Sequence, residues 1–104
     1  MKNSAGLTAT FEVQEANRSR VNGVLHFKTV TALLRVGSEA IGSGHAAVID
    51  LSGVSDSDSA GLALLIEWLS VAKAGSRTLS YENIPAQLHQ LARLSEVEEL
   101  LTAG

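Results

Sequence analysis

A cluster of hydroxyl and carboxylate side chains lies where an apolar run meets a helical pattern. The run Ala46-Ala47-Val48-Ile49 leads into a stretch rich in serine and aspartate, and a strongly hydrophobic segment begins at Ala60. This order predicts a strand, a tight loop and the N-terminus of a helix. The side chains at the predicted helix start are Asp56, Ser57, Asp58 and Ser59.

Two roles are open for Ser59. Its oxygen could accept a hydrogen bond from an unpaired N–H group of the first helical turn, which is an ordinary capping role. It could instead carry a phosphate, which free N–H groups and the positive end of the helix dipole would favour. Because Asp56 and Asp58 would repel that phosphate, phosphorylation would act mainly by adding charge to a surface that a partner must cover.

The motif around this cluster resembles the signature of STAS domains. It reads Asp-Leu-Ser-Gly-Val at 50–54 and Asp-Ser-Ala-Gly-Leu at 58–62. The resemblance covers nearly the full chain. The family includes anti-sigma-factor antagonists, sulfate-transporter tails and the MlaB component of bacterial phospholipid transporters. In the antagonists, the position matching Ser59 is the residue that a partner kinase phosphorylates.

Two further stretches are more similar to the MlaB-type domains than to the antagonists. They are Ala63-Leu64-Leu65, which continues into a long apolar helix, and 91–95, which reads Leu-Ala-Arg-Leu-Ser. Position 59 is serine where some relatives have threonine, so the hydroxyl is retained. The resemblance implies a non-catalytic adaptor that binds the ATPase of an ABC transporter moving phospholipids between the membranes of Gram-negative bacteria. The alternative is an anti-sigma-factor antagonist whose partner kinase phosphorylates Ser59.

Residues suited to catalysis or to metal binding form no complete motif. His26, His45 and His89 lie far apart in the sequence and lack a carboxylate companion at metal-ligand spacing. The segment 53–57 lacks the second glycine of a nucleophile elbow. The segment 42–47 imitates a dinucleotide fingerprint but precedes a strand instead of following one. We therefore expect no enzyme activity, no metal and no cofactor, and the resemblance implies that any ATP is bound by the partner.

Length and composition limit the possible classes of protein. At 104 residues, of which 45% are hydrophobic and 18% charged, the chain is expected to form a single domain over 1–104. A net charge of −3 gives no electrostatic reason to expect nucleic-acid binding. The absence of cysteine is compatible with a reducing cytoplasm. No apolar run approaches the ~20 residues needed to span a bilayer, so we expect a cytoplasmic protein that reaches the inner membrane only through its partner.

Hydrophobic periodicity predicts an α/β fold in which helices cover a mixed four-strand sheet, as the resemblance also implies. Strands are predicted at 7–13, 20–27, 46–51 and 77–81, the third buried on both faces. A polar turn is expected at 15–19 and a bulge or strand end at Gly23. The helices are expected to start near Thr29, Ser59, Pro85 and Ser95, the last turning Leu100 and Leu101 inward.

The helix after the cluster has two apolar sides. Residues Leu62, Leu65, Ile66 and Leu69 follow the spacing of a stripe that packs on the sheet. The second side is either covered by neighbouring helices or forms a docking surface that starts at the cluster. The interface residues predicted from the second interpretation are Asp56, Ser57, Asp58, Ser59, Ala60, Leu64, Trp68 and Val71.

Overall fold

The computed structural model describes residues 8–102 and forms one mixed sheet of order β1-β2-β3-β4. β1 (Ala9–Glu15) is antiparallel to β2 (Arg18–Leu25), whereas β3 (Val48–Ser57) is parallel to both β2 and β4 (Ser80–Glu82). The helices are α1 (Val30–Gly42), α2 (Ser59–Ala74), α3 (Ala86–Leu94) and α4 (Glu98–Thr102). The predicted α/β fold with a mixed four-strand sheet is confirmed.

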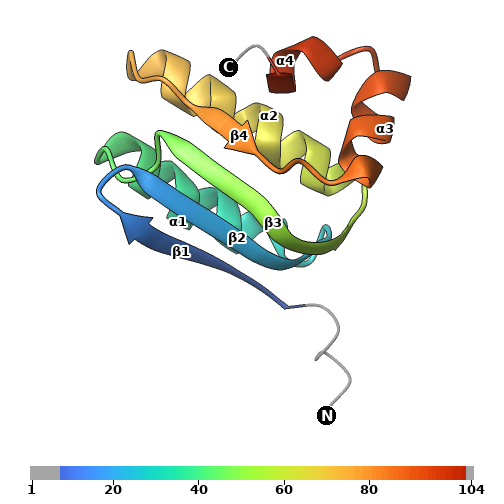
Figure 1. Cartoon of the computed structure of the whole chain (residues 1–104), viewed down its shortest axis with the longest axis horizontal. Helices are drawn as coiled ribbons and strands as arrows, with labels where there is room; N and C mark the ends of the chain where they lie inside the picture. Colours follow the sequence, from blue (N-terminus) through green and yellow to red (C-terminus); the bar gives the residue numbers. More distant parts are fainter. Residues whose placement is uncertain (1–7, 103–104) are drawn as a thin grey trace.

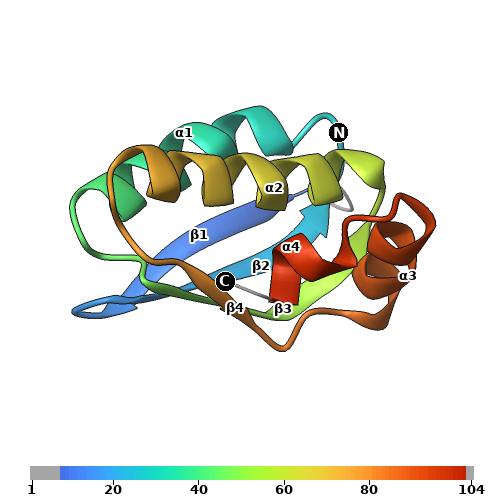
Figure 2. The same cartoon turned by 90° about the horizontal axis from the view of Figure 1, so that it is seen from above.

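The helices are layered against one face of this sheet. α1 and α2 lie side by side over it, and α3 and α4 continue beyond α2 next to β4 (Figures 1 and 2). Two successive parallel crossovers of the usual right hand, running in the same direction along a sheet, place both helices on the same face. The expectation that 46–51 is buried on both sides is therefore wrong. Ile49 and Leu51 are fully buried, whereas Asp50 is only partly buried and Ser52 is exposed.

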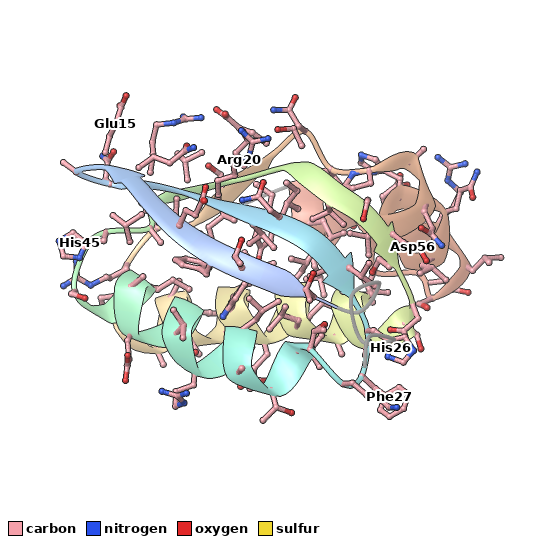
Figure 3. The ribbon with its side chains drawn as sticks, turned by 90° about the horizontal axis from the view of Figure 1, so that it is seen from below. Glu15, Arg20, His26, Phe27, His45 and Asp56 are labelled. Atoms are coloured by element: carbon pink, nitrogen blue, oxygen red, sulfur yellow. The ribbon has the colours of Figure 1, made fainter. Side chains whose placement is uncertain are left out.

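The other face of the sheet is polar. Figure 3 shows the side chains of Glu15 and Arg20 pointing away from the helices. Charged residues that are successive register partners across the four strands are Glu12, Arg20, Asp50 and Glu82. Because opposite charges alternate over the first three of these positions, the row supports the pairing of β1, β2 and β3.

The first hairpin is tighter than predicted. Its turn is confined to Ala16-Asn17, and β2 starts at Arg18. The predicted start of the first strand, residue 7, lies outside the described residues. The bulge predicted at Gly23 is confirmed by a register shift between Gly23 and Val24 and by a φ of 102°. A side chain at Gly23 would overlap with the carbonyl oxygen of Thr8, so this position requires glycine.

Other boundaries also differ from the predictions, and the fourth strand, predicted at 77–81, is Ser80–Glu82. β3 continues to Ser57 instead of ending at Leu51, so most of the predicted loop is strand. The last helix does not start at Ser95 as predicted. Ser95 ends α3, Glu96 has a φ of 60°, and α4 begins only at Glu98. Leu101 is buried as expected, but Leu100 is 51% exposed.

The largest buried side chain is Trp68 of α2, which is 0% exposed. Its indole N–H donates a hydrogen bond to the carbonyl oxygen of Leu34 in α1 at 3.3 Å. Its ring meets that of Phe11 in β1 edge-on, with centroids 5.6 Å apart. α1 leaves room for the indole only because position 37 is glycine, where a Cβ would overlap with the ring. The second apolar side of α2 is thus covered by α1. The prediction that Leu64 and Trp68 belong to an outward docking surface is therefore wrong.

This packing predicts that Gly37→Ala destabilises the protein although alanine is the better helix former. We expect a loss of about 1 to 3 kcal/mol in the free energy of unfolding, because the added methyl group overpacks the indole. The matched control is Gly42→Ala in the same helix, where a Cβ would meet nothing within 4 Å. Denaturant unfolding of both variants measures the difference, and equal stability of the two would show that Trp68 is free to move.

The polar face predicts a loss of stability in acid. The hydrogen bond from Asn83, together with those from Ser52, holds the pKa of Asp50 below its usual value, and the hydrogen bond from Arg18 does the same for Glu82. A carboxyl whose pKa is lower when folded stabilises the protein above its unfolded pKa. That contribution should disappear as the pH falls from about 5 to 2. Over this range, the melting temperature should depend less steeply on pH for Asp50→Asn than for the unmodified protein. An equal pH dependence of the two melting temperatures would show that Asp50 does not contribute to the loss of stability in acid.

Candidate functional site

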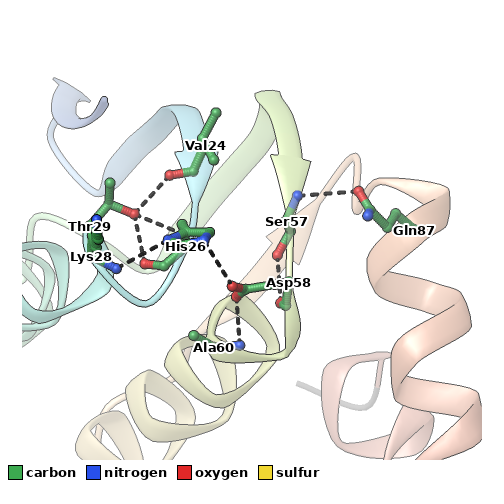
Figure 4. A network of polar contacts seen from close by, with 8 residues as sticks. All are labelled: Val24, His26, Lys28, Thr29, Ser57, Asp58, Ala60 and Gln87. Atoms are coloured by element: carbon green, nitrogen blue, oxygen red, sulfur yellow. Dashed lines mark hydrogen bonds and ion pairs between the residues drawn. The ribbon is translucent and has the colours of Figure 1, made fainter. Parts of the chain in front are cut away.

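The strand-to-helix junction is organised by a buried serine. Ser57, the last residue of β3, is 4% exposed. Its backbone N–H donates a hydrogen bond to Oε1 of Gln87 in α3 at 3.2 Å. Its hydroxyl donates to the carbonyl oxygen of Asp58 at 3.0 Å (Figure 4). In α2, any side chain at Gly61 would overlap with the Ser57 hydroxyl. Ser57 is therefore a structural residue of the junction and is not available to a partner.

The helix cap is Asp58 and not Ser59. Oδ1 of Asp58 accepts a hydrogen bond from the N–H of Ala60 at 2.8 Å. The other carboxylate oxygen, Oδ2, lies 3.7 Å from Nε2 of His26, which comes from the loop after β2 (Figure 4). Nδ1 of His26 accepts from the N–H of Lys28 at 3.4 Å, so Nε2 is the ring nitrogen that faces Asp58. The cap thus links the start of α2 to the loop between β2 and α1.

Ser59 is the first residue of α2 and is exposed. Because Asp58 supplies the capping oxygen, the Ser59 hydroxyl is left on the surface at the positive end of the helix dipole. Asp56, also exposed, precedes it by three residues on the end of β3. Asp58 is half-buried. Ser59 is therefore the member of the cluster best placed to be modified or covered by a partner.

An apolar groove extends from this point between α1 and α2. Its volume is about 300 Å³. Ala60 and Ala63 form part of its α2 side, and their small side chains keep it open. The lining residues are Val30, Thr31, Leu34, Ala60, Ala63, Leu64 and Glu67. Leu64 thus borders the groove although it is only 4% exposed.

An exposed aromatic side chain lies at the same end of the molecule. Phe27, which follows His26, is 62% exposed, and the two rings are 4.4 Å apart between centroids. Figure 3 shows Phe27, His26 and Asp56 gathered at one end of the sheet, with His45 at the other. We call the surface formed by His26, Phe27, Asp56, Asp58 and Ser59 the Ser59 end.

The structure brings together only part of the predicted interface. Asp56, Asp58, Ser59 and Ala60 lie at the exposed or half-exposed junction, whereas Ser57, Leu64 and Trp68 are buried. Val71 is half-buried farther along α2.

Sequence reasoning missed Phe27, Val30 and Leu34. The signal available for Phe27 was its position at the end of a predicted strand, followed directly by polar residues. It could equally have been a core residue. Its exposure depends on β2 ending at Leu25, two residues before Phe27.

Residues 8–102 contain no group of three or more His, Cys, Asp or Glu side chains that could hold a metal ion. In the same part of the chain, no helix combines the length and the apolar character needed to cross a membrane. The three histidines remain apart from one another: His26 faces Asp58, and His89 lies 3.5 Å from Glu98 through Nδ1.

Comparison with known proteins identifies the fold. The model of the family described as Mlab, STAS domain, matches residues 10–102. The chain is 18% identical to the anti-sigma factor antagonist SpoIIAA in its unphosphorylated form, covering 84% of this chain and 83% of that one with a TM-score of 0.64. It is also 18% identical to the Bacillus cell fate determinant SpoIIAA in the phosphorylated form, covering 86% and 85% with a TM-score of 0.65. A comparison with curated proteins gave no significant match.

The geometry of the cap predicts different effects for two neighbouring substitutions. Asp58→Ala should lower the free energy of unfolding by about 1 kcal/mol, because it removes the oxygen that accepts from Ala60. Ser59→Ala should change it by less than about 0.5 kcal/mol, because it alters an exposed side chain. Thermal or denaturant unfolding measures both, and a larger loss for Ser59→Ala would show that the cap is assigned to the wrong residue.

Proposed function

Since this chain belongs to the MlaB-type STAS domain family, we propose that it is a non-catalytic adaptor subunit of an ABC transporter that moves phospholipids. Its partner would be the ATPase of that transporter, whose assembly or activity it supports in maintaining the lipid asymmetry of the outer membrane. The observation that carries the proposal is the match of the MlaB-type model to residues 10–102. In this proposal the protein is cytoplasmic, the ATPase binds the nucleotide, and the chain meets the inner membrane only through the transporter.

The Ser59 end has the features of a docking surface. It contains Phe27, whose side chain is 62% exposed. It also lies next to the apolar groove of about 300 Å³ that is lined by Ala60. Exposed aromatic residues that enter a partner's pocket commonly contribute much of the affinity of an interface. Asp56 and Asp58 flank Ser59 with negative charge, so further negative charge at position 59 would be repelled and not paired within this chain. The small side chains of Ala60 and Ala63 allow close approach of a partner segment.

A second candidate is an anti-sigma-factor antagonist controlled by phosphorylation of Ser59. It is favoured by the exposure of Ser59 at the start of α2 and by the similarity in fold to SpoIIAA, which is described in both phosphorylated and unphosphorylated forms. A phosphate on Ser59 would meet the N-terminus of α2 but would lie close to the carboxylate of Asp58. Under this alternative the partner is the kinase of an anti-sigma-factor system.

Both candidates predict that charge at Ser59 weakens partner binding without unfolding the chain. We expect Ser59→Asp to raise the dissociation constant for the partner by about tenfold or more, because an unpaired charge would be buried in the interface. The matched control is Ser70→Asp, an exposed serine farther along the same helix. Titration calorimetry with the ATPase measures binding, and circular dichroism verifies the fold.

The two candidates are separated by the partner that co-purifies with the full chain. Recovery of an ABC transporter ATPase, with an intact mass lacking phosphate, supports the adaptor. Recovery of a kinase and a mass increased by one phosphate supports the antagonist. Equal binding of the ATPase by the unmodified protein, by Ser59→Asp and by Phe27→Ala would show that the interface lies elsewhere on the domain.

A further inference from the structure

The loop between β2 and α1 has a closely held backbone, although it carries the exposed side chain of Phe27. The hydroxyl of Thr29 donates to the carbonyl oxygen of Val24 at 2.8 Å and accepts from the N–H of His26 at 2.9 Å (Figure 4). The N–H of Thr29 donates to the carbonyl oxygen of His26 at 2.8 Å. The main chain around Phe27 is therefore tied to the end of β2.

The side chain of Phe27 has much weaker support than its backbone. It is 62% exposed. Among residues 8–102, the aromatic ring that packs against it is the imidazole of His26, with centroids 4.4 Å apart and an interplanar angle of 40°. Nζ of Lys28 lies 5.8 Å from the centre of the Phe27 ring, near the limit of a cation–π contact. Because a lysine ammonium ends a flexible stem, the imidazole is the group that can fix the Phe27 ring.

The imidazole of His26 is itself held through both ring nitrogens. Nε2 lies 3.7 Å from Oδ2 of Asp58, and Nδ1 accepts from the N–H of Lys28 at 3.4 Å. The side chain of His26 is only 29% exposed. Oδ1 of the same Asp58 carboxylate caps α2. The imidazole is thus fixed between the start of α2 and its own loop, with a face left for the ring of Phe27.

We propose that His26 is a positioning residue of the Ser59 end, which sets the orientation of Phe27 relative to Ser59. These two side chains come from different segments of the chain. Ser59 directly follows Asp58, so the contact between Asp58 and His26 connects the two halves of the surface. A side chain that is ordered before binding loses less entropy when a partner covers it. The link to partner binding rests on the proposed function, whereas the orientation of Phe27 does not.

The first test reads the orientation of Phe27 without a partner. The chain has two phenylalanines, so the full chain labelled with fluorophenylalanine should give two fluorine NMR resonances. The resonance of Phe11 reports the packing against Trp68. Asp58→Asn keeps an oxygen for the helix cap but removes the carboxylate that faces His26. We expect both Asp58→Asn and His26→Ala to move the Phe27 resonance toward that of free fluorophenylalanine and to leave the Phe11 resonance in place.

The control for this test is His45→Ala, which changes an exposed histidine at the other end of the sheet (Figure 3). It should leave both resonances unchanged. A Phe27 resonance that stays in place in His26→Ala would overturn the proposal. Equal movement of the Phe11 and Phe27 resonances would also overturn it, because that result would indicate a general loosening of the fold.

The second test measures binding to the ATPase of the transporter by titration calorimetry. His26→Ala should raise the dissociation constant by about three- to tenfold, which is the cost of ordering one side chain on binding, and His45→Ala should not change it. Because His26 acts through Phe27, the double variant with Phe27→Ala should bind as well as Phe27→Ala alone. Additive losses would overturn the proposal. Failure of the unmodified chain to bind the ATPase would contradict the proposed function and not the positioning role, which the fluorine spectra test separately.

Discussion

The insertion of Trp68 between α1 and the sheet is the contact on which the helical layer depends. The indole fills the space left at Gly37, donates to the backbone of Leu34 and meets the ring of Phe11, so it touches α1 and β1 from α2. A tryptophan in this position fixes the distance and the rotation of α1 relative to α2, because a close-packed interior tolerates few other arrangements. Tyr81 reinforces the layer on the other side by donating from its hydroxyl to the carbonyl oxygen of Leu65 at 2.6 Å.

This packing decides what remains for binding at the surface. With Trp68 and most of Leu64 covered by α1, α2 offers a partner its first turn and the groove that it forms with α1. The junction before it is held from three directions: Gln87 binds the backbone of Ser57, His26 faces Asp58, and the carboxylate of Asp58 caps the helix. A rigid support of this kind would lower the entropic cost of partner binding at the proposed docking surface around Ser59 and Phe27.

The layering also leaves the sheet asymmetric. One face is covered by helices and carries the apolar side chains, whereas the other carries the charged row from Glu12 to Glu82 and faces solvent. Such a sheet keeps its register, because a slip by one residue would move every apolar side chain to the polar face.

Local sequence patterns determined the order of the elements, the mixed four-strand sheet, the bulge at Gly23 and the start of α2 at the Ser–Asp cluster. These features follow from periodicity and backbone preferences within a few residues, so the sequence is enough to predict them. Which side of α2 is outward, the burial of Ser57 and the exposure of Phe27 were decided only by tertiary structure. An apolar side chain such as Trp68 has the same local pattern whether a partner or α1 covers it, and only the packing of distant segments, here Gly37 against the indole, distinguishes the two.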